Sequence, residues 1–140
     1  MKKFLQWRDD WYLGVDEIDQ QHLALVDLVN RIAQSLEDSE QPSGSKKTAM
    51  DLLLLLQDET RSHFKDEEDF MRIHDYPEQR SHHREHALLQ AELRDLIREV
   101  EEKERLLDLD ILISLKHWLI NHVIDSDLEI ARHLKKRGTL

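Results

Sequence analysis

The chain contains no cysteine, and this absence narrows the chemistry it can perform. Without thiols, disulfide bonds, thiolate zinc sites, cysteine-ligated iron–sulfur clusters and cysteine nucleophiles are all excluded. Glycine and proline are also scarce, with 3 and 2 residues among 140. Because these residues favour tight turns, their scarcity predicts long helices joined by few connections.

Long hydrophobic runs and an excess of basic residues are missing as well. The longest aliphatic run extends from Leu52 to Leu56, whereas a membrane-spanning helix needs roughly 20 apolar residues. No basic and then apolar signal segment opens the chain, so we expect a cytoplasmic protein without membrane insertion. The formal net charge of −10 argues against nucleic acid as a partner, because its phosphates would be repelled. The length suits one domain, residues 1–140.

Apolar residues recur at alternating spacings of three and four in four stretches of the chain, as on a helix with one apolar face. The pattern predicts helices at about residues 18–38, 46–73, 78–101 and 109–137, and either Asp108 or Asp110 can cap the last. Residues 1–17 are rich in aromatic residues without a clean period, so we expect an ordered N-terminal arm. The sequence therefore predicts an all-α fold, an antiparallel up-down-up-down four-helix bundle.

Six titratable side chains fall on the helix faces that should form the core. Burying them without partners would cost on the order of several kcal/mol, and a metal centre removes that cost because neutral imidazoles and carboxylates become ligands. The imidazole-rich, thiolate-free set suits iron, zinc, copper or nickel. The set contains more ligands than one tetrahedral zinc site can use, which favours two metal ions. The six are His22, His63, Glu67, His82, His86 and His122.

The spacing of these residues supports a shared site but leaves one ligand open. His63 and Glu67 are four residues apart, as are His82 and His86, so each pair lies on one side of its helix. On the last helix, Asp125 lies about 60° around an ideal helix from His122 and Asp127 about 140°. Ideal helix geometry favours Asp125 as the ligand. To reach the same site as His122, Asp127 would need to lie between two helix–helix contact lines or to follow a local bulge in the helix. We expect Glu68 at the solvent, and four histidines at the surface or in packing roles: His74, His83, His117 and His133.

Taken in order, these segments resemble the bacteriohemerythrins, single-domain relatives of hemerythrin and myohemerythrin. The resemblance covers nearly the whole chain. It rests on Trp7, Tyr12-Leu13-Gly14-Val15, Ile18-Asp19-Gln20-Gln21-His22, His63-Phe64-Lys65-Asp66-Glu67-Glu68, Met71, Tyr76-Pro77, His82 with His86, and Trp118-Leu119-Ile120-Asn121-His122-Val123 with Asp127.

The resemblance implies a non-haem di-iron centre in which the two irons share an oxo or hydroxo bridge. His22 and His63 would bind the iron that takes dioxygen, and Glu67 and Asp127 would bridge the pair. Family spacing thus selects Asp127 over Asp125. The other iron would be bound by His82, His86 and His122.

The same correspondence implies an apolar oxygen pocket, although bundle packing alone also explains its members. Leu119 is the stronger case because it lies one turn before His122. An apolar pocket excludes the water that would promote oxidation of the iron. The pocket residues are Phe64, Trp118, Leu119 and Val123.

The function implied is reversible dioxygen binding by an oxygen carrier, storage or delivery protein that is not an enzyme. One alternative is a di-iron oxidase or peroxidase. Ferritin-like sites use Glu-x-x-His motifs, and no histidine of this chain has a glutamate three residues before it. Five imidazoles with two carboxylates also supply less negative charge for oxygen activation. A second alternative is an oxygen or redox sensor that acts on a separate protein partner.

Overall fold

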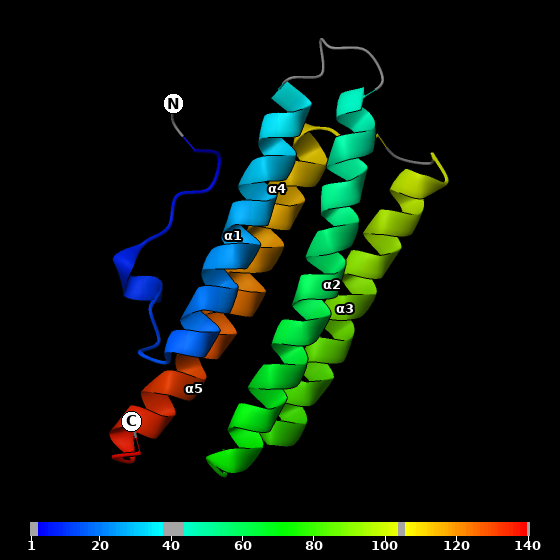
Figure 1. Cartoon of the computed structure of the whole chain (residues 1–140). Helices are drawn as coiled ribbons and strands as arrows, with labels where there is room; N and C mark the ends of the chain where they lie inside the picture. Colours follow the sequence, from blue (N-terminus) through cyan, green and yellow to red (C-terminus); the bar gives the residue numbers. More distant parts are fainter. Residues whose placement is uncertain (1–2, 38–43, 104–105, 140) are drawn as a thin grey trace.

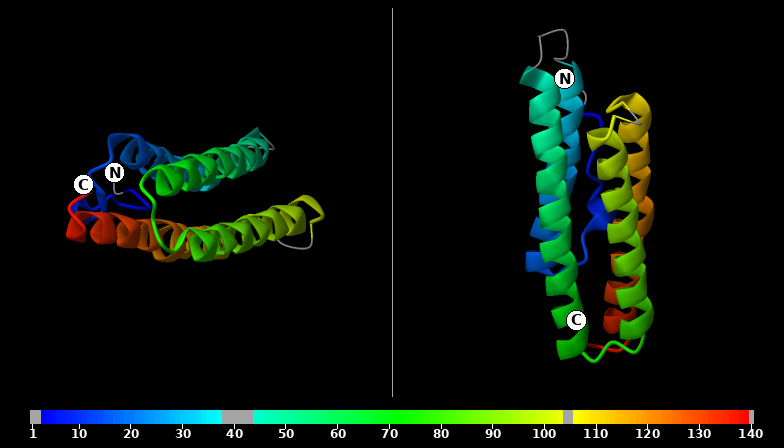
Figure 2. Two further views of the ribbon diagram at one scale, coloured as in Figure 1. Left: turned by 90° about the horizontal axis from the view of Figure 1, so that it is seen from below. Right: turned by 90° about the vertical axis from the view of Figure 1, so that its right-hand side faces the viewer.

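The computed structural model describes residues 3–37, 44–103 and 106–139, and the side chains of all of these except residues 44–47 and 122. Long helices run side by side along the molecule (Figure 1). Figure 2 shows two layers, with α1 beside α2 in one and α3 beside the last helix in the other. In chain order the elements are α1 (Asp16–Glu37), α2 (Gly44–Ile73), α3 (Gln79–Glu101), α4 (Leu109–His117), the π-helical segment η3 (Trp118–Ile124) and α5 (Asp125–Lys136).

The predicted all-α four-helix bundle is confirmed, and no β-strand occurs in the described ranges. The main difference lies in the last helix, which was predicted as one helix at about 109–137. It is three segments, because η3 separates α4 from α5. α1 and α2 each begin two residues earlier than predicted, and residue 38, the predicted end of the first helix, lies outside the described residues.

The apolar stripes form a long core between the helices, and a smaller separate cluster contains Met71, Tyr76, Ile130 and Leu134. Leu25, Val29 and Ile32 of α1 are buried, as are Leu53 of α2 and Leu115 of α4, so the period of the sequence corresponds to the inward faces. The remaining faces are charged. Among the described residues, no helix is both long and apolar enough to cross a lipid bilayer.

The last helix begins at a capped position. The side chain of Asp108 accepts a hydrogen bond from the backbone N–H of Ile111 at 3.3 Å, which satisfies one of the free donors of a helix start. Of the two predicted caps, the structure therefore uses Asp108, and Asp110 lies within the first turn.

The N-terminal arm packs along the bundle beside α1 (Figure 1). The side-chain amide of Asn30 accepts from the Leu5 N–H at 2.7 Å and donates to the Leu5 carbonyl at 2.8 Å. Lower down, the Asp19 carboxylate accepts from the N–H groups of Leu13 and Gly14, at 2.8 and 3.1 Å. Gly14 has φ of +91°, which a residue with a side chain adopts only with strain. The arm ends two residues earlier than predicted, where α1 begins.

Candidate metal centre

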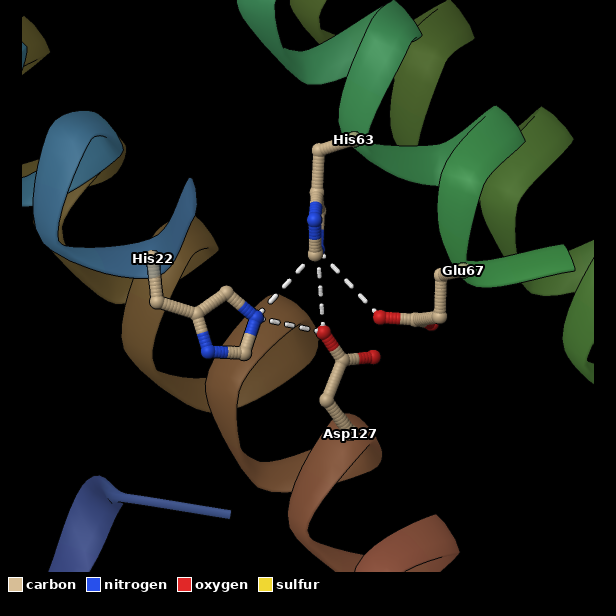
Figure 3. Close-up of side chains that lie close together, drawn as sticks. All are labelled: His22, His63, Glu67 and Asp127. Atoms are coloured by element: carbon tan, nitrogen blue, oxygen red, sulfur yellow. Dashed lines mark hydrogen bonds and ion pairs between the residues drawn. The ribbon is translucent and has the colours of Figure 1, made fainter. Parts of the chain in front are cut away.

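Four buried side chains from three helices meet in the middle of the bundle (Figure 3). His22 comes from α1, His63 and Glu67 from α2, and Asp127 from α5. Asp127 Oδ2 lies 2.6 Å from His22 Nε2 and 3.0 Å from His63 Nε2. The two Nε2 atoms are 3.2 Å apart, and Glu67 Oε2 is 3.2 Å from His63 Nε2. Four such atoms converging on one point can hold a metal ion.

A second group adjoins the first and shares both of its carboxylates. Glu67 Oε1 lies 2.6 Å from His82 Nε2 and 3.0 Å from His86 Nε2 on α3. Asp127 Oδ1 is 3.3 Å from His82 Nε2. Each carboxylate therefore directs one oxygen to the first group and the other oxygen to the second. This is the arrangement that two bridging carboxylates require.

The π-helical turn of η3 accounts for the position of Asp127. A π-turn closes its hydrogen bond over five residues instead of four, so the chain after it is rotated relative to an ideal α-helix. Asp127 consequently faces the core, while Asp125 is exposed. The local bulge that Asp127 would need is thus present. His122 belongs to the η3 backbone, but its side chain lies outside the described part of the chain.

The groups hold one another through hydrogen bonds that determine their charge. Burial lowers the pKa of His63, but its interactions with the Asp127 and Glu67 carboxylates together raise it more strongly, to about 10. The same causes raise the pKa of His82 to about 10. Burial raises the pKa of Asp127, yet its hydrogen-bonded neighbours, His22 among them, hold it well below the ordinary value. A cation that bound here would replace these imidazole protons.

The polar atoms of the cluster fit a metal ion better than they fit one another. Glu67 Oε2 is buried without a hydrogen bond, although it lies 3.2 Å from His63 Nε2. A buried carboxylate oxygen without a partner is costly, and a cation between the two groups would satisfy it. The donor set combines imidazoles with carboxylates and no thiolate, which suits iron and other first-row transition metals. The residues present therefore fit the metal centre implied by the sequence.

All four residues of the predicted oxygen pocket are buried: Phe64, Trp118, Leu119 and Val123. The Phe64 ring stacks on the His86 imidazole, with centroids 3.9 Å apart and planes at 5°. The Trp118 indole donates to the carbonyl of Leu89 at 3.2 Å. Their burial agrees with a dry pocket and with ordinary packing, so the pocket stays a prediction.

Glu68 differs from the expectation that it would be solvated. Its side chain is half-buried between two histidines of α3. Oε2 lies 3.4 Å from the outer nitrogen of His86, and Oε1 pairs with His83 Nδ1. The place of Glu68 next to Glu67 in the sequence does not indicate these contacts. They depend on how α3 is rotated relative to α2. His83 itself is exposed, as expected.

The remaining histidines lie at the surface or in packing roles, as expected. His74 contacts the Phe70 ring and His133 the Tyr76 ring, while His117 is exposed. Gln21 and Asp66, for which the sequence predicted no role, hydrogen-bond each other at 2.8 Å beside His63. The sequence indicates them only by position: Gln21 directly precedes the predicted ligand His22, and Asp66 follows the predicted ligand His63 by three residues.

Comparison with known proteins places these features in context. The hemerythrin HHE cation binding domain family matches residues 13–134. Similar proteins include the bacteriohemerythrin of Pseudomonas aeruginosa, 30% identical over 92% of this chain and 82% of that protein. The bacteriohemerythrin of Stenotrophomonas maltophilia is 28% identical over 94% of this chain and 82% of that protein. The bacteriohemerythrin of Clostridium acetobutylicum is 25% identical over 88% of this chain and 95% of that protein. No solved structure matches.

Proposed function

This chain belongs to the hemerythrin HHE cation binding domain family, and from that premise we propose that it binds dioxygen reversibly at a non-haem di-iron centre. The proposed role is that of an oxygen carrier, storage or delivery protein and not of an enzyme. The observation that carries the proposal is the pair of carboxylates, Glu67 and Asp127, each of which belongs to both metal-ligand groups.

We assign six ligands from the two groups and His122 from the family motif in the sequence. His22 and His63 would hold one iron, and Glu67 and Asp127 would bridge it to the other. The second iron would be held by His82, His86 and His122. Two ferrous ions at these positions would supply the electrons that bind dioxygen reversibly. The chain itself holds the imidazoles in place, neutralises the cations and excludes water through the buried side chains around the cluster.

The charge of the donor set favours the carrier over oxygen activation. The described cluster has four imidazoles and two carboxylates, and neutral imidazoles stabilise highly charged iron less well than carboxylates do. A sensor that acts on a protein partner, and a di-iron oxidase or peroxidase, remain the alternatives. The deciding experiment is an oxygen titration of the anaerobic ferrous protein followed by absorption. Reversible spectral change supports the carrier, whereas continuous consumption of a reductant supports an enzyme.

Metal content is the first expected result. Since two ligand groups share their carboxylates, we expect protein purified without oxygen to contain two irons per chain by elemental analysis. Protein that contains one zinc per chain, and takes up no iron on reconstitution, would contradict the assignment.

The two aspartates of the last helix should behave differently. Asp127 is buried in the cluster, whereas Asp125 is exposed. We expect Asp127→Ala to lose bound iron because both groups lose a ligand, and Asp125→Ala to keep both irons. The reversed result would show that the rotation introduced by η3 has been misassigned.

A further inference from the structure

One ligand of the proposed centre is held from behind by a side chain that binds no metal. Gln21 Oε1 lies 2.7 Å from His63 Nδ1, the ring nitrogen that faces away from the cluster. The other end of the Gln21 amide donates to Asp66 Oδ2 at 2.8 Å. Because Gln21 directly precedes His22, α1 supplies a partner to each nitrogen of His63: His22 to Nε2 and Gln21 to Nδ1.

These contacts determine which proton His63 keeps when a metal ion binds. An ionised carboxylate only accepts hydrogen bonds, so the Gln21 amide must turn its nitrogen to Asp66 and its oxygen to His63. An amide oxygen also only accepts, and so Nδ1 of His63 must carry a proton. When a metal ion displaces the Nε2 proton, the neutral imidazole keeps its proton on Nδ1 and presents the lone pair of Nε2 to the ion. In the structure Nε2 faces Asp127 and His22, where an ion would bind.

The other described histidines of the cluster lack such a support. The outer nitrogens of His22 and His86 have no hydrogen-bond partner, although Glu68 Oε2 lies 3.4 Å from the latter. The outer nitrogen of His82 has Glu85 Oε2 at 4.0 Å, which is beyond hydrogen-bond distance. Within the described residues, the support is therefore specific to the half of the centre that contains His63.

We propose that Gln21 is a positioning residue that selects the metal-binding tautomer of His63, with Asp66 orienting its amide. The inference rests on the proposed function, because it concerns the ion bound between His22 and His63. Partners of this kind are known to orient metal-bound imidazoles, and their removal lowers metal affinity by about 10–100-fold. The effect should be confined to one of the two ions, since the two hydrogen bonds of Gln21 go to Asp66 and His63 and not to His82 or His86.

The test is a titration of metal-free protein with Co²⁺, read from its absorption and from competition with a chelator. In Gln21→Leu we expect one of the two ions to bind about 10–100-fold more weakly and the other to bind as in the wild type. The matched control is Gln20→Leu, which makes the same change at an exposed neighbour and should bind both ions normally. Normal binding of both ions by Gln21→Leu would overturn the inference.

A second variant and a spectroscopic readout separate positioning from packing. Asp66→Ala frees the Gln21 amide to reverse and should weaken the same ion by a smaller factor. In zinc-loaded protein with ¹⁵N-labelled histidine, the Nδ1 proton of His63 should exchange slowly with water, and more rapidly in either variant. Unchanged exchange and unchanged affinity in Asp66→Ala would refute the role even if Gln21→Leu does not fold. A wild-type protein that binds fewer than two ions would instead refute the proposed function.

Discussion

Metal-free protein should unfold at a much lower temperature than iron-loaded protein. The bundle buries four described histidines and two carboxylates around one point, and a metal ion that binds the native state alone stabilises it by mass action. A free metal concentration of about 1,000 times the dissociation constant contributes about 4 kcal/mol. For a chain of this size, that contribution raises Tm by about 14 °C. Calorimetry of both forms measures the difference, and identical Tm values would contradict a buried metal centre.

The two forms should also respond to pH in opposite ways. In the metal-free protein, the pKa values of His63 and His82 are raised to about 10, above the unfolded value of about 6.5. The stabilisation from these pairs is therefore complete below about pH 6.5 and is lost as the pH rises through about 10. Acid weakens the iron-loaded form instead, because protons compete with the metal for the imidazoles. The Tm difference should thus widen from pH 6 to pH 9.

Replacing Leu119 with alanine is expected to accelerate oxidation of the ferrous centre and to destabilise the fold. Leu119 is fully buried three residues before His122, so the shorter side chain would leave a cavity and cost about 2–5 kcal/mol of unfolding free energy. If Leu119 also shields the irons, the cavity should admit water and small anions. Autoxidation followed by absorption should then be faster, and azide should bind more readily, while both irons remain bound.

A remote core residue separates these two effects. Leu53 is equally buried on α2 but lies ten residues, more than two helical turns, before His63. Leu53→Ala should lose a similar free energy of unfolding without any change in autoxidation. If Leu119→Ala is destabilised to the same degree and oxidises at the wild-type rate, Leu119 is a packing residue and the oxygen pocket is wrongly assigned.

The sequence was sufficient for the features that depend on repetition along one helix. The period of Leu25, Val29 and Ile32 predicted α1, and the spacing of His63 from Glu67 predicted a shared face. These arguments require only that each helix be regular, and the all-α bundle is confirmed. The family that the motifs resemble is confirmed as well.

The features that escaped prediction depend on two helices at once. Glu68 reaches His86, and Gln21 reaches His63 and Asp66, only because neighbouring helices meet at a particular rotation. Periodicity within one helix contains no information about that rotation. Asp127 is an intermediate case, since spacing within a regular helix favoured Asp125, whereas the family motif favoured Asp127. The assignment of Asp127 as a ligand stays a prediction that its substitution can test.

The π-turn of η3 makes the register of the last helix depend on a single residue. Buried positions around it, at Leu115, Leu119, Val123, Asp127 and Ala131, follow one another in steps of four. In a regular helix each step would drift by about 40°, and the wider turn absorbs much of that drift. Deleting one residue from η3 would rotate all of α5 by about 100°. The carboxylate at the cluster and the apolar contacts near the C-terminus would then be lost in the same event, so chemistry and packing in this helix can only change together.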